Sequence, residues 1–349
     1  MPRSQNHIKV AAKTTRLDIE SLKKLEFSLG TVRSKLRAVA LVADTLFSPF
    51  PKPDKLRPFQ KKFRKTKDRL IDNPIEPLRG IQKQIQRKLL GPLDLPFYLC
   101  GGVKGRTLLD NVMLHAGAAT IVTIDIKDFF PSINNRRVYF VWTRVLGCAP
   151  RIGAVLTRLT TRNHYLPQGS STSTTLANLA LFSVDKPIRE ACEKAGVRYS
   201  TWVDDLAFSG STSRDIIPVV IRTLRTAGFS LSRKKIKIMG PGTRKVLNGV
   251  LANRFPSVLP ERLSQLRSGI HKLRTNQVPV DSLRKYVIQL RSSIAQVGSI
   301  NSGKAKRLQE DFDLAVKMAY PANQPTAVPA QMSNATRTMN LFDGFKAAK

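Results

Sequence analysis

Two adjacent aspartates, Asp204 and Asp205, interrupt an apolar, β-prone stretch over residues 198–209. Stretches of this kind form paired strands, so the aspartates are expected at the tip of a hairpin. A second short apolar strand, predicted over 120–126, carries Asp125 near its end. Neighbouring carboxylates repel each other unless a cation compensates. The pattern therefore predicts a site of oxygen ligands, which suits one or two Mg²⁺ ions held together with substrate phosphates.

The plainer interpretation of Asp204 and Asp205 is a surface turn, because aspartate is common in turns. The apolar residues on both sides argue against this interpretation, and so does the second acidic strand end at Asp125. Two metal ions that clamp the attacking and leaving oxygens are the usual machinery of polymerases. We therefore expect Asp125, Asp204 and Asp205 to be the catalytic carboxylates of a nucleotidyltransferase.

The charge balance indicates a polyanionic partner. The 349 residues include 59 Lys and Arg against 24 Asp and Glu, a net charge of +35. Nucleic acid is the usual partner of such a surface, and a membrane surface or a ribosome is the alternative. No apolar run is long enough to span a membrane, and residues 1–6 lack the apolar core of a signal peptide. The three cysteines are scattered, which fits a cytoplasmic protein without a membrane partner.

Hydrophobic periodicity predicts helices over 77–90, 134–146, 151–159 and 213–227, and basic helices throughout 260–320. A strand pair is predicted between 229–239 and 245–252, joined by a Gly-Pro-Gly turn. Residues 1–60 are expected to form a basic, helical N-terminal extension, and 321–349 a flexible tail rich in Pro, Ala, Gln and Asn.

Several short motifs occur along the chain in a defined order. They are Ile124-Asp-Ile-Lys-Asp-Phe-Phe-Pro-Ser132, Leu166-Pro-Gln-Gly-Ser170, Leu176-Ala-Asn-Leu179, the Asp-Asp hairpin, Ser232-Arg-Lys-Lys235, Arg244-Lys-Val246 and Asn248-Gly249. Over residues 65–320 this order resembles prokaryotic reverse transcriptases, most closely the retron type.

The resemblance implies an α+β fold, the right-hand polymerase. Its fingers would span 61–118 with part of 150–170, its palm 119–255 with an antiparallel sheet plus helices, and its helical thumb 256–320. The implied activity is RNA-directed DNA synthesis, in which a bound structured non-coding RNA is copied into cDNA with two Mg²⁺ ions, or Mn²⁺ as a substitute. Implied partners are this RNA, the RNA–DNA duplex, dNTPs and an effector protein of anti-phage defence.

The same resemblance assigns roles around the aspartates. Asp125, Asp204 and the backbone oxygen of Ile126 would hold metal, and Asp205 would tune the site or bind metal less directly. Residues 128–130 would lie where the incoming triphosphate is gripped.

Three further side chains are assigned to the nucleotide. Asp128 begins the segment at the triphosphate. Phe130 would be the steric gate against a 2′-hydroxyl, whereas core packing is the preferred interpretation of Phe129. Gln168 would contact the nucleotide or the template, with an ordinary loop glutamine as the alternative.

Basic side chains are expected at the triphosphate and along the duplex, although each charge taken alone is also consistent with a solvated surface. At the triphosphate these are Arg69 and Lys235, with Lys67 and Lys234 as further candidates. On the thumb they are Arg262, Arg267, His271, Lys272 and Arg274.

Some positions depart from the family pattern. Trp202 stands where these enzymes usually have Tyr, and its ring is still expected beneath the primer end. Asn111-Val-Met-Leu-His115 is a near match to the Asn-Ala-x-x-His motif of retron enzymes. Asn111 and His115 predict either RNA recognition or a buried hydrogen-bonded pair. Ser171 and Thr174 replace prolines.

Two rival functions remain open. One is a different prokaryotic defence polymerase, which primes on protein or works without a normal template, and the changes at Trp202, Ser171 and Thr174 allow it. The other is a non-catalytic RNA-binding scaffold, which the survival of Asp125, Asp204 and Asp205 disfavours.

Overall fold

The computed structural model describes residues 47–51, 70–232 and 236–319. Several predictions therefore lie outside the described residues. These are the tail, most of the N-terminal extension, and the triphosphate-binding roles of Lys67, Arg69, Lys234 and Lys235.

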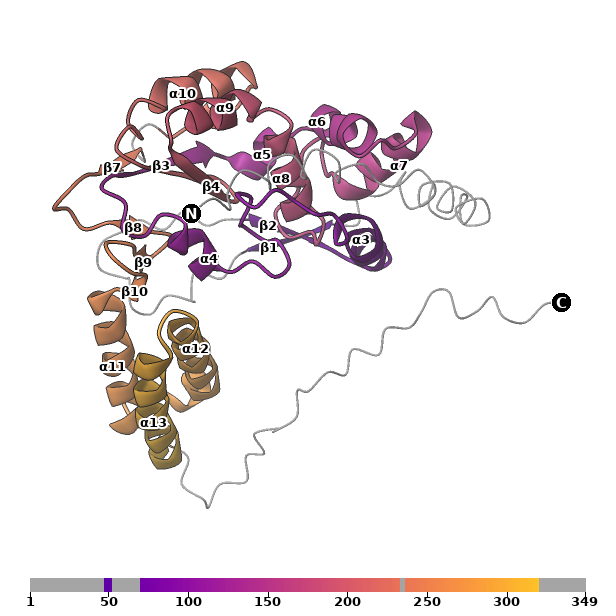
Figure 1. Cartoon of the computed structure of the whole chain (residues 1–349). Helices are drawn as coiled ribbons and strands as arrows, with labels where there is room; N and C mark the ends of the chain where they lie inside the picture. Colours follow the sequence, from indigo (N-terminus) through magenta and orange to yellow (C-terminus); the bar gives the residue numbers. More distant parts are fainter. Residues whose placement is uncertain (1–46, 52–69, 233–235, 320–349) are drawn as a thin grey trace.

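An antiparallel sheet forms the centre of the fold (Figure 1). Its middle strand β3 (Ile121–Lys127) pairs on one side with β5 (Asp205–Ser209), and β5 pairs with β4 (Arg198–Trp202). On the other side, β3 pairs with β7 (Lys237–Met239) along its first half and with β6 (Ser230–Leu231) at its end. The predicted hairpin and the α+β class are confirmed.

The two faces of this sheet differ in chemistry. Val122, Ile124 and Ile126 of β3 alternate with Thr123 and Asp125, so the apolar side chains share one face. That face is buried in the main core, to which several helices contribute. Among them are α8 (Ser173–Phe182), α9 (Lys186–Lys194) and α10 (Ile217–Thr226).

Asp125 is therefore on the opposite face, and α4 (Leu108–Met113) packs on that face through Val112, which shares a small core with Ile121 and Ala207. Thr107 caps this helix in a reciprocal capping box with Asp110. α4 contacts β4, which brings the residues that follow the helix over the polar face of the sheet. The helix thus separates part of this face from solvent.

The region beside the sheet is mostly helical. Two helices continue into one π-helical turn each, α3 (Leu78–Ile85) into 86–90 and α6 (Asn135–Phe140) into 141–145. These two segments correspond to the helices predicted over 77–90 and 134–146. α7 (Pro150–Thr160) begins at a proline, as expected at a first helical position.

Strand β1 (Phe47–Pro51) corrects one prediction. It falls within the stretch that we assigned to a helical extension, yet it pairs antiparallel with β2 (Leu70–Pro74). The three prolines in these two strands remove backbone donors, which a two-stranded edge tolerates better than a central strand does. The paired residues of β1 and β2 are 19 to 27 positions apart in the sequence, so local pattern does not reveal the pairing.

The predicted pairing of 229–239 with 245–252 is wrong. β7 instead joins the central sheet, while β8 (Val246–Leu247) and β9 (Val250–Leu251) form their own hairpin, which β10 (Ser257–Val258) extends. Asn248 and Gly249 connect β8 and β9 with φ of 48° and 83°. Positive φ at both positions is the requirement of the type I′ turn, for which Asn-Gly is the strongest sequence signal.

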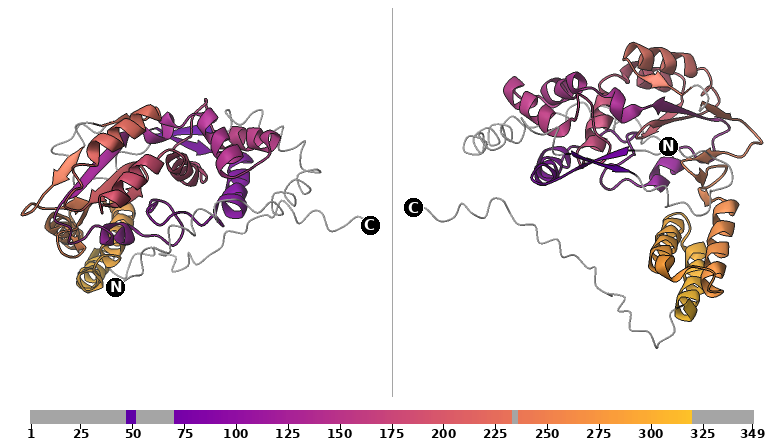
Figure 2. Two further views of the ribbon diagram at one scale, coloured as in Figure 1. Left: turned by 45° about the horizontal axis from the view of Figure 1, so that its top comes forward. Right: turned by 180° about the vertical axis from the view of Figure 1, so that it is seen from behind.

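A three-helix bundle follows. α11 (Pro260–Arg274), α12 (Val280–Gly298) and α13 (Ser302–Ala319) surround their own apolar core, and this confirms the predicted helices. Figures 1 and 2 show the bundle beyond β8–β10, away from α6 and α7. Within the described ranges, no helix is both long enough and apolar enough to cross a bilayer.

Candidate active site

The hairpin that carries the aspartates is very tight. Trp202 pairs with Asp205, so Val203 and Asp204 alone connect β4 to β5. Val203 has φ of +62°, which a β-branched residue rarely adopts. The mirror-type turns of two-residue hairpins require such an angle. Backbone strain of this kind persists where the surrounding structure enforces it, often at functional sites.

A row of three residues crosses the sheet beside this tip. Asp125 is opposite Asp205, and Asp205 is opposite Trp202. Residues directly opposite in antiparallel strands share a face, with Cβ atoms about 4.5–5.5 Å apart. The Ile126 N–H donates to the Asp204 carbonyl at 3.0 Å, which ties the hairpin tip to the end of β3. The predicted carboxylates are therefore together at one edge of the sheet.

These carboxylates suit a hard cation. Among the described residues, no group of three or more His, Cys, Asp or Glu side chains is arranged as a ready-made metal cage. Mg²⁺ differs from most metals here, since it usually binds through one or two carboxylates and completes its shell with water and substrate phosphates. Asp125 opposite Asp205 supplies that ligand type, and like charges directly opposite are unfavourable without a cation. The residues present thus fit a divalent ion that completes its coordination with water and, when the nucleotide is bound, with its phosphates.

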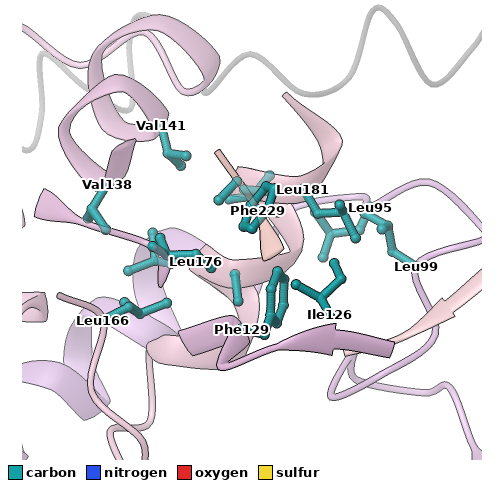
Figure 3. Packing of buried hydrophobic residues seen from close by; sticks show 14 of the residues in the cluster. Leu95, Leu99, Ile126, Phe129, Val138, Val141, Leu166, Leu176, Leu181 and Phe229 are labelled. Atoms are coloured by element: carbon teal, nitrogen blue, oxygen red, sulfur yellow. The ribbon is translucent and has the colours of Figure 1, made fainter. Parts of the chain in front are cut away.

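Residues 128–130 follow β3 directly. The Asp128 side chain is exposed, and its backbone is in the left-handed region, with φ of 48°. Asp128 is the N-cap of α5 (Phe129–Ser132). The Phe129 side chain is 2% exposed and packs against Phe229, with ring centroids 5.7 Å apart (Figure 3). Phe130 is half-buried. The core interpretation of Phe129 agrees with this packing, and Phe130 keeps a partly open face on which a sugar could pack.

Gln168 lies in a turn fixed by β2. Its carbonyl accepts a hydrogen bond from the Asp72 N–H at 2.7 Å, and Asp72 also forms an ion pair with Arg162. A Cβ at Gly169 would lie 2.6 Å from the Asp72 carbonyl, so only glycine fits there. The Gln168 side chain is partly exposed. Nothing in the sequence pattern indicated that Asp72 and Arg162 support this turn.

Asn111 and His115 are buried, with exposed fractions of 1% and 0%. The His115 ring is between two serine hydroxyls, Ser209 at 2.8 Å from Nδ1 and Ser200 at 2.7 Å from Nε2. The Asn111 side chain is bonded to Ser200 and to Asn248. Of the two interpretations, the structure displays the hydrogen-bonded one, and neither side chain presents a surface to RNA.

Burial lowers the pKa of His115 to about 3, and the positive charge of Arg198 adds to the effect. The unfolded chain takes up this proton near pH 6.5, whereas the folded chain does not. The stability that depends on neutral His115 is therefore present above pH 6.5 and is lost as pH falls below it. Between pH 7.5 and 5.5 this loss is about 1.4 kcal/mol.

We accordingly expect His115→Gln to lose about 1.4 kcal/mol less than the wild type over the same pH change. Urea unfolding at pH 7.5 and 5.5 measures the difference. His271→Gln, at an exposed histidine on α11, is the control. If the free energy of unfolding of His115→Gln depended on pH as strongly as that of the wild type, His115 would not be the buried neutral group.

The thumb candidates do not form a single face. Arg267, His271 and Arg274 are exposed and three to four residues apart, so they share one side of α11. Lys272 is exposed on another side, and Arg262 is partly buried. Their contact with a duplex stays a prediction.

A loop that the sequence analysis missed packs behind the hairpin. The N–H groups of Cys100 and Gly101 donate to the Thr201 carbonyl at 2.9 and 3.3 Å. The Gly101 carbonyl accepts from the Asn178 amide of α8 at 2.9 Å. Arg106 holds the start of this loop by donating to the carbonyls of residues 95, 96 and 99. The only sequence signal for this loop was the glycine pair at 101–102.

Comparison with known proteins adds independent findings. The model of the family described as "Reverse transcriptase (RNA-dependent DNA polymerase)" matches residues 50–280. Retron Se72 reverse transcriptase of Salmonella heidelberg (strain 579083-10) is 30% identical over 191 residues, which cover 55% of this chain and 48% of that protein. Retron Ec86 reverse transcriptase of Escherichia coli is 27% identical over 272 residues, covering 77% and 78%. Retron Mx65 reverse transcriptase of Myxococcus xanthus is 25% identical over 261 residues, covering 69% and 60%.

The chain thus spans about half of the first relative and more than three quarters of the second. Among solved structures, telomerase from Candida albicans in complex with a TWJ fragment of telomeric RNA has a TM-score of 0.43 and 10% identity, covering 81% of this chain and 59% of that one. A foamy viral protease–reverse transcriptase in complex with double-stranded DNA has a TM-score of 0.37 and 16% identity, covering 78% and 43%.

Proposed function

Because this chain belongs to the reverse transcriptase (RNA-dependent DNA polymerase) family, we propose that it copies an RNA template into DNA. The observation that carries the proposal is the row in which Asp125 faces Asp205, beside Asp204 at the hairpin tip. Its curated relatives are retron reverse transcriptases. We extend the proposal to a bound, structured non-coding RNA as template, and to anti-phage defence with an effector protein.

In the proposed reaction, a primer 3′-hydroxyl, or a 2′-hydroxyl of the RNA itself, attacks the α-phosphate of a dNTP. The new phosphodiester bond forms as the bond between the α- and β-phosphates breaks, and pyrophosphate leaves. Reverse transcriptases generally use divalent metal ions, and two Mg²⁺, or Mn²⁺ instead, would supply charge stabilisation for both oxygens. Asp125, Asp204 and the Ile126 carbonyl would hold them, and Asp205 would bind metal less directly.

Other protein groups would bind the nucleotide, the primer and the duplex. The backbone that starts α5 at Asp128 would bind the triphosphate, and Gln168 would contact the nucleotide or the template. Trp202, on the same face as Asp205, would support the primer end. The exposed basic residues of α11 would bind the duplex backbone, so affinity should fall steeply with salt.

Selection of deoxynucleotides provides one prediction. If Phe130 is the steric gate, Phe130→Ala makes room for a 2′-hydroxyl and raises incorporation of rNTP relative to dNTP by at least about tenfold. Single-nucleotide primer extension with matched dNTP and rNTP measures the ratio. Phe140→Ala removes a ring that is 47% exposed on α6 and serves as the control. An unchanged ratio in Phe130→Ala would remove Phe130 from this role.

The retron-type proposal is tested in the native host. We expect the purified protein to carry one structured RNA joined covalently to a defined cDNA, and an Asp204→Ala/Asp205→Ala double variant to carry the RNA without the DNA. Sequencing of the co-purified nucleic acid distinguishes the alternatives. DNA without an RNA linkage would favour a protein-primed or template-independent polymerase, and RNA without DNA in both samples would favour a scaffold.

A further inference from the structure

A continuous line of hydrogen bonds connects a buried histidine to one of the candidate catalytic carboxylates. Starting from the carboxylate, the Asn248 amide donates to Asp205 Oδ2 at 3.1 Å, and Asn111 Nδ2 donates to Asn248 Oδ1 at 2.9 Å. Asn111 Oδ1 in turn accepts from the Ser200 hydroxyl at 2.6 Å. His115 then joins Ser200 at 2.7 Å to Ser209 at 2.8 Å.

The direction of every bond in this line follows from the chemistry of its members. An amide nitrogen can only donate, so Asn248 Nδ2 donates to Asp205 and Asn111 Nδ2 donates to the Asn248 oxygen. Asn111 Oδ1 can only accept, so the single hydroxyl proton of Ser200 points toward Asn111. Ser200 Oγ must then accept from the histidine, which places the ring proton of His115 on Nε2.

The neutral form of His115 completes the line. Its lowered pKa keeps the ring uncharged at physiological pH, so Nδ1 is an acceptor and Ser209 donates to it. All five donors therefore point the same way, toward Asp205. Aligned hydrogen bonds polarise one another, and donation to a carboxylate favours its charged form.

We propose that Asn248 is a positioning residue that orients the Asp205 carboxylate for metal binding, and that the line through Asn111, Ser200 and His115 holds Asn248 in place. The proposal rests on the polymerase function proposed above. Groups that bond to metal-binding carboxylates commonly set their orientation, and their loss costs about 10- to 100-fold in metal affinity or activity.

The β8–β9 hairpin explains how Asn248 reaches the site. The I′ turn puts Asn248 at the tip with φ of 48°, a conformation that asparagine tolerates and most residues do not. Leu247 and Val250 on either side of the turn are buried in the small core that also contains Ile121 and Ala207 of the central sheet. The hairpin is thereby fixed against the strands whose edge carries the carboxylates.

Asn248→Gly is the decisive variant, because glycine keeps the positive φ of the turn and removes only the amide. We expect it to raise the dissociation constant for Mn²⁺, measured by calorimetry on the full chain without nucleotide, by about 10- to 100-fold. Circular dichroism on the same preparation should show a chain that is still folded at the assay temperature. Ser200→Ala interrupts the line two steps further back and is expected to weaken Mn²⁺ binding in the same direction, by less.

Asn276→Gly is the matched control, because Asn276 also has positive φ, 53°, but an exposed side chain beyond α11. Wild-type Mn²⁺ affinity in Asn248→Gly would overturn the proposal. A wild-type protein that binds Mn²⁺ but makes no DNA on any template would instead refute the polymerase function, so the two failures are distinguishable.

Discussion

Asp204→Asn is expected to lower the rate of DNA synthesis by at least about 1000-fold, while the protein stays folded. A catalytic metal stabilises the transition state by several kcal/mol, and each 1.4 kcal/mol is about a tenfold change in rate. The asparagine side chain of this variant has the same shape as the aspartate, but it is a neutral ligand in place of a charged one. It leaves the backbone carbonyl of Asp204 bonded to the Ile126 N–H, so the hairpin tip remains attached to β3.

Single-turnover primer extension on an RNA template measures this loss, and circular dichroism on the same preparation reports the fold. Asp215→Asn, which neutralises an exposed aspartate near the start of α10, is the control. Removal of one of three clustered negative charges also relieves repulsion, so the melting temperature should not fall. A variant that extends primers at the wild-type rate would remove Asp204 from the catalytic centre.

Gly101→Ala is expected to lower activity by about 100-fold, although Gly101 contributes no side chain to the site. A Cβ at this position would lie 2.4 Å from the Val203 nitrogen, 2.7 Å from Val203 Cγ2 and 2.9 Å from the Trp202 carbonyl carbon. Two of these are backbone atoms of the hairpin tip. The loop cannot easily move back instead, since Gly101 is bonded to Thr201 on one side and to Asn178 on the other.

The clash therefore displaces Val203 and, with it, the adjoining Asp204. Misplacement of catalytic groups by about 1 Å is enough to cost two orders of magnitude in rate. Gly303→Ala in α13 is the control, because its nearest neighbour is 3.7 Å away and alanine favours helix. Primer-extension rates of the two variants, with melting temperatures, test the expectation. Normal activity in Gly101→Ala would show that the contact between Gly101 and Val203 does not determine the position of the hairpin tip.

The sequence was sufficient for the parts of the site that depend on local pattern. Apolar flanks around Asp204 and Asp205 predicted the hairpin, and the apolar strand predicted that Asp125 would be nearby. The register Asp125–Asp205 then follows from pairing the two strands. Basic helices over 260–320 were predicted from periodicity alone, and the structure resolves them into α11, α12 and α13.

Features set by long-range packing were beyond sequence reasoning. Asn248 and Asp205 are 43 residues apart, and their bond depends on the β8–β9 hairpin, which we had assigned to a longer strand pair. The Asn-Gly signal at 248–249 was present in the sequence and would have corrected that assignment. The contact of Gly101 with Val203 had no such signal, because a glycine pair also marks an ordinary loop.

The most direct test of the central claim is primer extension by the purified protein on an RNA template of defined, mixed sequence, followed by sequencing of the product. The account predicts DNA complementary to the template, dependent on Mg²⁺ or Mn²⁺ and abolished in Asp204→Asn. DNA unrelated to the template, or no DNA with either metal on any primed RNA, would contradict it.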